Sequence, residues 1–286
     1  MDAKEKNRPT ERTLYLVGTP IGNLSDISDR AKKILSEVDF IAAEDTRNSL
    51  KLLSLLGIKK ELVSYYEHNK RSSGERIMAR ILGGESCALV TDAGMPAISD
   101  PGEDIVRLAA ESGVCVSVVP GPCAAVSALA ISGLPTRKFT FEGFLSASKS
   151  ERRRELSELS SERRTMIFYE APHKLKQTLS DMKDAFGEGR RISLCRELTK
   201  LNEEVFRTDI GNAVLYYEEH EPRGEYVLIV EGETREKTDP LAELDVPSHI
   251  EHYVSLGMEK KDAIKAVARD RGVSKSEIYK YTIEEK

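Results

Sequence analysis

The chain has 286 residues, which is too long for one typical domain and about right for two. Hydrophobic residues make up 40% and charged residues 32% of it, the composition of an ordinary globular protein that builds a core without disulfide staples. With a net charge of −5, the chain as a whole does not attract nucleic acid. Binding to nucleic acid would therefore need a local basic patch.

Residues 13–134 alternate strand and helix patterns, after an N-terminus at residues 1–12 that we expect to be disordered. Strands are predicted at residues 14–18, 39–45, 61–67, 86–92 and 114–119. Helices are predicted at residues 27–35 with Ser28 as a candidate cap, 47–56, from a cap at Ser72 or Ser73 to Leu82, 103–112 and 123–132. This alternation predicts an α/β domain with a parallel sheet and helices on both of its faces.

Residues 135–232 form a second α/β series in which more strands follow one another directly, so we expect a mixed sheet. Strands are predicted at residues 138–145, 165–171, 191–198, 203–208 and 225–232, and helices at 172–186, 210–219 and in the charged stretch that follows Leu145. Residues 233–245 have the composition of a linker, and residues 246–286 read as a purely helical C-terminal module.

The four cysteines, Cys87, Cys115, Cys123 and Cys195, form no C-x-x-C pair and each has apolar sequence neighbours. We therefore expect buried free thiols in a reducing compartment, and neither a zinc site nor a disulfide framework. The polar N-terminus has no secretory pattern and no apolar run reaches the length of a membrane span, so the predicted location is the cytoplasm.

Three glycine- and proline-rich loops follow predicted strands of the first sheet: GTPIGNLSD (18–26), TDAGMPAISDPG (91–102) and VPGPCAA (119–125). In open parallel sheets ligands bind outside the carboxyl ends of the strands, so three such loops at one edge predict a ligand site. Glycine lets the backbone approach a ligand, and proline fixes a loop in advance. No P-loop or dinucleotide fingerprint is present, and the carboxylates of Asp92 and Asp100 suit a ligand that carries ammonium or sulfonium charge.

The motifs GTPIGNL, AAEDTR, DAGMPAISDPG and VPGPCAA, in this order, resemble those of the tetrapyrrole-methylase-type methyltransferases. The motifs EGFL, IFYEAPHKL and RELTKLNEE narrow the resemblance to the branch that methylates a cytidine ribose 2′-oxygen in small-subunit (16S) ribosomal RNA. The chain departs from the family at Ser146, where a proline usually follows EGFL. The resemblance implies S-adenosylmethionine bound between two α/β domains, a homodimer, and an RNA-binding tail. This cofactor is an activated methyl donor, so no metal is required.

The residues expected to bind the cofactor lie in the three loops. They are Thr19, Pro20, Gly22, Asn23, Asp92, Ala93, Gly94, Pro96, Ser99, Asp100, Pro120, Gly121 and Ala124.

A ribose hydroxyl is a weak acid, so a general base or a cation near its oxygen should speed the transfer. The candidates, which lie near strand ends, are Glu44, Asp45, Arg47 and Glu170. Asp45 or Thr46 could instead cap the next helix, and the polar groups of the second domain could instead form salt bridges between the domains. The sequence does not choose the base.

Substrate contacts are expected from polar loops and from a basic belt in the second domain. The candidates are His68, Asn69, Arg152, Arg153, Arg154, Tyr169, Arg196 and Lys200, together with Lys275 and Lys280 of the tail. In the tail, Ala268, Gly272 and Ile278 have the spacing of a helix-turn-helix. The arginine-rich helix could instead be a solvated surface, and the tail could be a module that only packs on a neighbour.

Two other functions stay open at this point. One is methylation of a tetrapyrrole-like small molecule. The basic belt and the helical tail argue against it, because such an enzyme needs neither. The other is non-catalytic binding of nucleic acid, against which the three loops count. RNA is the expected partner, either free or within the assembled small subunit.

Overall fold

The computed structural model describes residues 8–234 and 244–281. Most of the predicted N-terminal segment (1–12) and of the predicted linker (233–245) therefore lies outside the described residues. The chain divides into two compact units, Met1–Gly232 and Glu233–Lys286, each of which is described by itself.

The first sheet is parallel throughout, with strand order β3-β2-β4-β1-β5. Its strands are β1 (Thr13–Val17), β2 (Phe40–Ala43), β3 (Glu61–Ser64), β4 (Cys87–Val90) and β5 (Cys115–Val119). All five follow the predicted order, and the parallel arrangement is confirmed. The carboxyl ends of the strands therefore share one edge of the sheet.

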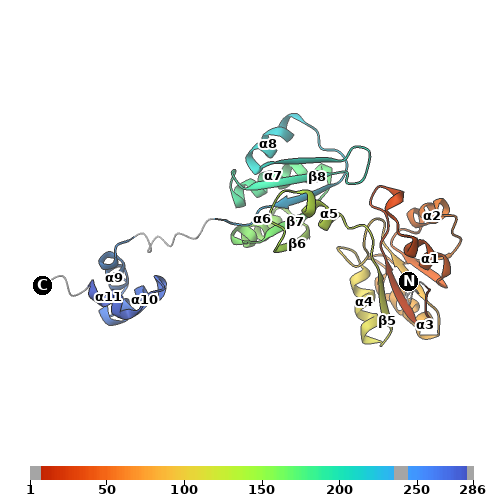
Figure 1. Ribbon diagram of the computed structural model, residues 1–286, viewed down its shortest axis with the longest axis horizontal. Coiled ribbons are helices and arrows are strands. Elements are labelled where there is room, and N and C mark those ends of the chain that lie inside the picture. Colours follow the sequence, from red (N-terminus) through yellow and green to blue (C-terminus); the bar gives the residue numbers. More distant parts are fainter. Residues whose placement is uncertain (1–7, 235–243, 282–286) are drawn as a thin grey trace, which may run out of the picture. The chain divides into compact units, whose positions relative to one another are not determined.

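Helices cover both faces of this sheet (Figure 1). They are α1 (Asp29–Glu37), α2 (Thr46–Leu55), α3 (Lys70–Leu82) and α4 (Gly102–Glu111), with a 3-10 turn η1 at Leu24–Asp26. A further helix, α5 (Ala124–Ile131), follows β5. One core contains buried residues of α1 and α2, and the opposite core contains buried residues of α3 and α4.

Two predicted helix caps have different outcomes. Ser28 caps α1 and accepts a hydrogen bond from the Ala31 amide at 3.1 Å, as predicted. The cap predicted at Ser72 or Ser73 is wrong, because α3 begins at Lys70 and Ser73 is buried inside the helix. Asn69 precedes this helix, and its side-chain oxygen accepts a hydrogen bond from the Tyr66 amide at 2.8 Å.

The second sheet is mixed, as predicted, with strand order β6-β7-β10-β8-β9. Its strands are β6 (Phe139–Phe144), β7 (Thr165–Glu170), β8 (Arg191–Arg196), β9 (Glu204–Asp209) and β10 (Tyr226–Val230). The β6–β7 pair is parallel and the other pairs are antiparallel. The helices α6 (Lys149–Glu158), α7 (Pro172–Phe186) and α8 (Ile210–Glu219) supply one core on this sheet, and a 3-10 turn η2 (Leu159–Ser161) follows α6.

The opposite face of the second sheet is covered by α5. Ala125, Ala128 and Leu129 of this helix pack with Ile167 and Val227 of the sheet. The predicted first domain, residues 13–134, includes this helix. Because α5 directly follows a ligand loop of the first sheet, its packing brings that loop to the second sheet.

The second unit contains α9 (Val246–Ser255), α10 (Lys260–Asp270) and α11 (Lys275–Lys280). As the spacing predicts, Ala268 and Ile278 are buried together in its core, and Gly272 turns the chain between α10 and α11 with a φ of +64°. Ser274 and Glu277 form a capping box that starts α11. Within the described ranges, no helix combines the length and the apolarity that crossing a bilayer requires.

The cysteines differ from one another in exposure. Cys87 and Cys195 are buried as expected, and burial raises the pKa of the Cys87 thiol to about 12. The expectation is wrong for Cys115, which is exposed because β5 is an edge strand, and Cys123 is only half-buried. In the part of the chain that the structure describes, no cluster of histidine, cysteine or acidic side chains could hold a metal ion.

Candidate functional site

The three glycine-rich loops meet, as the parallel sheet predicts. The backbones of Thr19 and Gly94 form two hydrogen bonds, because the amide of each residue donates to the carbonyl oxygen of the other, at 2.9 and 3.1 Å. The first and third loops pack backbone against backbone, since a Cβ on Gly18 would lie 2.6 Å from the Gly121 Cα. Only glycine allows this approach, so these loops form one continuous surface.

The second loop is fixed from within. Both carboxylate oxygens of Asp100 accept backbone N–H groups, from Ala97 at 3.0 Å, Ile98 at 3.3 Å and Gly102 at 2.7 Å. Ala97 and Ser99 hold left-handed φ values of 69° and 60°. Such a conformation costs about 1–3 kcal/mol per residue and persists only where the surroundings enforce it. The loop is therefore preformed.

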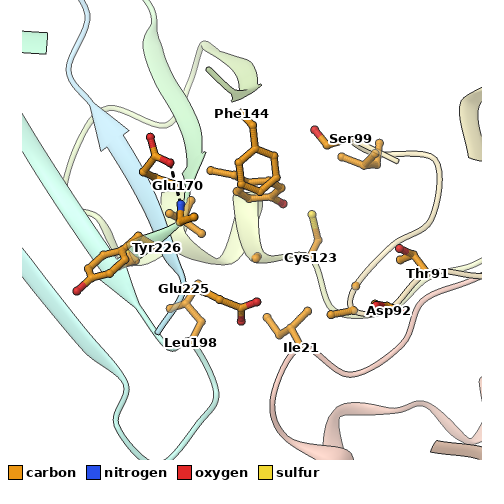
Figure 2. A pocket seen from close by; sticks show the side chains of 18 of the residues that line it. Ile21, Thr91, Asp92, Ser99, Cys123, Phe144, Glu170, Leu198, Glu225 and Tyr226 are labelled. Carbon is orange, nitrogen blue, oxygen red and sulfur yellow. Dashed lines mark hydrogen bonds between the residues drawn. The ribbon is translucent and has the colours of Figure 1, made fainter. Parts of the chain in front are cut away.

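A cavity of about 550 Å³ lies between these loops and the second sheet (Figure 2). Its volume is within the range of about 300–1,000 Å³ that is typical of small-molecule sites. The first sheet and its loops contribute Ile21, Glu44, Thr91, Asp92, Ala93, Gly94, Met95, Ile98, Ser99 and Asp100, and the start of α5 contributes Cys123 and Ala124. The second sheet and its loops contribute Phe144, Tyr169, Glu170, Ala171, Pro172, His173, Cys195, Glu197, Leu198, Lys200, Glu225, Tyr226 and Val227.

The segment after β8 closes the cavity on the side of the second sheet. Glu197 and Thr199 hold left-handed φ values of 52° and 65°. A Cβ on Gly22 would lie 2.4 Å from the Lys200 Cγ, so the first loop packs tightly on this segment. Strained backbone on both sides of the cavity is typical of functional sites.

The cavity lining is acidic. It contains the carboxylates of Glu44, Asp92, Asp100, Glu170, Glu197 and Glu225. The ammonium of Lys200 also lines the cavity. The Lys200 ammonium binds Glu197 at 2.8 Å and Glu225 at 2.7 Å, and this contact holds the pKa of Glu197 below its usual range. More carboxylates than cations remain, so the cavity favours a positively charged ligand.

Two of these carboxylates hold the loops together as well. The Thr91 hydroxyl donates to Glu44 Oε2 at 2.7 Å, and the Asn48 side-chain amide donates to Asp92 Oδ2 at 3.0 Å. Glu170 differs, because it is buried and both of its oxygens are engaged. It accepts from the Thr178 hydroxyl at 2.5 Å and from the Ala171 amide at 2.8 Å.

Tyr169 contributes an aromatic wall. Burial raises the pKa of its hydroxyl to about 12, so the phenol stays protonated at neutral pH. Its ring packs against Phe141 at 5.2 Å and Phe144 at 5.4 Å between ring centroids.

The predicted cofactor residues divide into two groups. Asp92, Ala93, Gly94, Ser99, Asp100 and Ala124 line the cavity. Thr19, Pro20, Gly22, Asn23, Pro96, Pro120 and Gly121 lie in the same loops but do not line it. Thr19 and Gly121 instead hold the loops against one another, through the contacts described above.

Among the predicted catalytic residues, Glu44 and Glu170 line the cavity, whereas Asp45 and Arg47 do not. Asp45 caps α2 and pairs with the Arg47 guanidinium at 2.7 Å, contacts that lower the pKa of Asp45 to about 2. The alternative that Asp45 caps the next helix is confirmed. The catalytic role of Asp45 and Arg47 stays a prediction, for two residues outside the cavity lining.

The predicted RNA contacts near the first sheet lie outside the cavity. His68 is exposed, and the Asn69 side chain holds the turn before α3. Tyr169 and Lys200 do line the cavity, whereas Arg196 binds Glu204 at 2.9 Å outside it.

The prediction for Arg152 is wrong, because this side chain is buried. Its guanidinium binds Asp181 at 2.7 Å and ties α6 to α7. Burial alone would raise the pKa of Asp181, but Arg153 and Arg152 hold it below its usual value. Arg153 is half-exposed and also pairs with Asp184 at 3.0 Å, and Arg154 is exposed. Lys275 and Lys280 are exposed on α11 of the second unit.

Sequence reasoning missed most of the wall that the second sheet provides. On the side of the second sheet the missed residues are Phe144, Ala171, Pro172, His173, Cys195, Leu198, Glu225, Tyr226 and Val227, and on the side of the first sheet and α5 they are Ile21, Thr91, Met95, Ile98 and Cys123. The motifs EGFL, YEAPH and REL contain several of them and were the available signal. Their apolar members are indistinguishable in sequence from residues of an ordinary core.

Comparison with known proteins places the chain in a family. A sequence profile described as Tetrapyrrole (Corrin/Porphyrin) Methylases matches residues 13–214. The chain is 50% identical over 278 residues to the ribosomal RNA small subunit methyltransferase I of Halalkalibacterium halodurans, and the match covers 96% of each protein. Proteins of the same name are 47% identical in Bacillus subtilis, over 93% of this chain and 92% of the relative, and 42% identical in Escherichia coli O157:H7, over 95% of both.

Solved structures share the fold at low sequence identity. Diphthine synthase has a TM-score of 0.60 at 14% identity, over 78% of this chain and 91% of its own. Uroporphyrin-III-C-methyltransferase from Thermus thermophilus has a TM-score of 0.56 at 20% identity, over 77% of this chain and 94% of its own.

Proposed function

The chain belongs to the tetrapyrrole methylase family, and from this premise we propose that it methylates the 2′-oxygen of a cytidine ribose in small-subunit ribosomal RNA, with S-adenosylmethionine as the methyl donor. One observation supports this function over others in the family. The match to ribosomal RNA methyltransferases runs along nearly the whole chain at 42–50% identity. The likeness to enzymes that act on other substrates is one of fold alone.

The cavity fits the cofactor in size and charge. S-adenosylmethionine carries an ammonium and a sulfonium, and the acidic lining with Asp92 at the end of β4 suits both. The apolar side chains of Leu198 and Val227 suit the uncharged part of the molecule. When bound, the cofactor supplies a methyl group on a positively charged sulfur, already activated for transfer to an oxygen.

The protein then has to position the ribose oxygen and to accept its proton. The preformed loops hold the site in place, and positioning of this kind contributes about 7–11 kcal/mol at best. We assign the proton acceptor to Glu44 in preference to Glu170. Glu170 is buried with both oxygens engaged, whereas Glu44 is half-buried and holds one hydroxyl hydrogen bond, from Thr91.

We assign RNA contacts to exposed or positively charged side chains, both at the cavity and outside it. Tyr169 and Lys200 lie at the cavity, and Arg153, Arg154 and His68 lie outside it on the first unit. Lys275 and Lys280 supply positive charge on the second unit. Phosphate contacts of this kind add affinity that falls as salt increases.

A homodimer in the cytoplasm is part of the proposal. The edge strand β5 exposes Val118, and α5 exposes Val126 and Ile131, and a second copy could cover apolar side chains of this kind. The cytoplasm is where bacterial ribosomal subunits are found, and we infer that the enzyme meets its RNA there, either free or in the assembled subunit.

The test is methyl transfer from labelled S-adenosylmethionine to unmodified small subunits and to their naked RNA, followed by digestion to nucleosides. We expect 2′-O-methylcytidine as the labelled product. Glu44→Gln should lower kcat, measured at saturating cofactor, by about 100-fold, within the usual range for a general base. Glu75→Gln on α3, outside the cavity, is the matched control. Label in a base, or none in cytidine, would contradict the proposal.

A further inference from the structure

Phe144 is an exposed aromatic ring at the rim of the cavity. It lines the cavity and is nevertheless 59% exposed, whereas Leu198 and Val227 of the inner wall are 7% and 6% exposed. In Figure 2 its side chain extends into the space between Ser99 and Glu170. A large apolar ring left open to solvent at a binding site indicates a partner that covers it.

An irregularity in β6 places this ring. Phe141 pairs with Ile167 and Phe144 pairs with Tyr169, so β6 has one residue more than β7 between these two pairs. Gly143 sits in the irregularity with a φ of +66°. Because side chains alternate along a strand, the extra residue moves Phe144 to the face that carries Phe141 and Tyr169. A regular strand would turn Phe144 away from the cavity.

Tyr169 supports the ring from behind. The centroids of the two rings are 5.4 Å apart and their planes are tilted by 58°. Tyr169 is itself held by Phe141, whose ring centroid lies 5.2 Å from its own. Phe144 is therefore ordered by its neighbours while much of its surface stays open.

A second apolar side chain stands on the opposite loop. Ile98 lines the cavity and is 47% exposed. Its neighbour Ser99 packs on the irregular stretch of β6, since a Cβ on Gly143 would lie 2.9 Å from the Ser99 hydroxyl oxygen. The rim thus carries an exposed apolar group from each side, on two segments that touch.

We propose that Phe144, with Ile98 beside it, is the platform on which the base of the target nucleotide stacks while its ribose reaches into the cavity. This inference rests on the proposed function. An RNA has to approach the cavity from its solvent side, because a polymer is too large to reach the buried inner wall. A small cofactor can reach that wall. Single-stranded bases are held in proteins by stacking on aromatic rings.

The experiment compares Phe144→Ala, Phe144→Leu and Phe144→Tyr with Phe139→Ala. Phe139 is a matched control because it lies on the same strand, is 43% exposed, and does not line the cavity. Two quantities are measured for each variant. One is the small-subunit concentration that gives half-maximal single-turnover methylation at saturating cofactor, and the other is the Kd for S-adenosylmethionine.

We expect Phe144→Ala to raise the half-maximal subunit concentration by about 5- to 150-fold, the range that alanine substitution of stacking rings gives. Phe144→Tyr should stay within about twofold of the wild type, because it keeps the aromatic face. Phe144→Leu should lie between them, because it keeps apolar surface without that face. The cofactor Kd and the Phe139→Ala variant should be unchanged, and the retained Kd also shows that the variants are folded.

Two outcomes would overturn the proposal. A rise in the cofactor Kd of Phe144→Ala that matches its loss of methylation would place the cofactor on the ring. Unchanged values in both measurements would show that nothing stacks there. A wild-type protein that binds the cofactor and methylates no subunit RNA would instead refute the proposed function.

Discussion

At the scale of single residues, the proposed chemistry depends on carboxylates that the loops hold in an acidic cavity. Asp92 is the clearest case, because it is exposed at the end of β4 and is oriented by Asn48 at 3.0 Å. An isolated carboxylate at this position would attract any cation. With Glu44 and Asp100 beside it in the lining, it favours a ligand with more than one positive centre.

Asp92→Asn should weaken binding of S-adenosylmethionine by about 10-fold, because the shape stays and one charge interaction is lost. Titration calorimetry with S-adenosylhomocysteine, which lacks the charge on sulfur, separates the two charged centres of the cofactor. A smaller loss with that compound would assign Asp92 to the sulfonium. Equal affinity of the variant and the wild type for both compounds would contradict the placement of Asp92.

At the scale of elements, the first half of the site could be predicted from the sequence and the second half could not. Glycine- and proline-rich loops after parallel strands must meet at one edge, and the Gly18–Gly121 contact confirms that they do. The second wall consists of side chains such as Leu198 and Val227, which have the pattern of core residues. Only the packing of α5 on the second sheet shows that they face a cavity.

Charge runs were equally ambiguous in the sequence. Arg152, Arg153 and Arg154 are consecutive, yet the first is buried on Asp181 and the third is exposed. The difference arises because α6 packs on α7 through one of its faces, and that face has no apolar signature at this position. Sequence alone therefore could not separate a structural arginine from one that is free to meet RNA.

Gly18→Ala tests the contact between the first and third loops. The new Cβ would lie 2.6 Å from the Gly121 Cα and 2.7 Å from the Met95 sulfur, so the backbone has to move. We expect the free energy of unfolding in a denaturant titration to fall by about 1–3 kcal/mol and cofactor binding to weaken. Gly189→Ala is the control, because nothing lies within 4 Å of its Cβ position. A Gly18→Ala protein with wild-type stability and affinity would disprove the tight contact.

At the scale of the whole molecule, we propose that the first unit carries out the transfer and that the second unit adds affinity for RNA. The cavity belongs to the first unit, and the second unit has its own small apolar core with exposed lysines on α11. The net charge of −5 conceals this local distribution. A separate unit with its own core can add RNA affinity without taking part in the transfer step.

Removing the residues after Gly232 should leave the cofactor Kd unchanged and lower the affinity for RNA. The slope of log K against log salt should become shallower by about 1 for each phosphate contact that is lost. The double variant Lys275→Ala, Lys280→Ala should reproduce part of this effect. Lys265→Ala, whose ammonium pairs with Asp262 at 2.5 Å, should not. Equal RNA binding by the shortened and full chains would refute this role of the second unit.

A structure determined with S-adenosylmethionine bound tests the central claim most directly. We predict the cofactor in the cavity between the two sheets of the first unit, with Asp92 facing its positive charge and its methyl group directed toward the solvent side, where the exposed ring of Phe144 lies. A cofactor bound outside this cavity, or one whose methyl group points into the inner wall of Leu198 and Val227, would contradict this prediction.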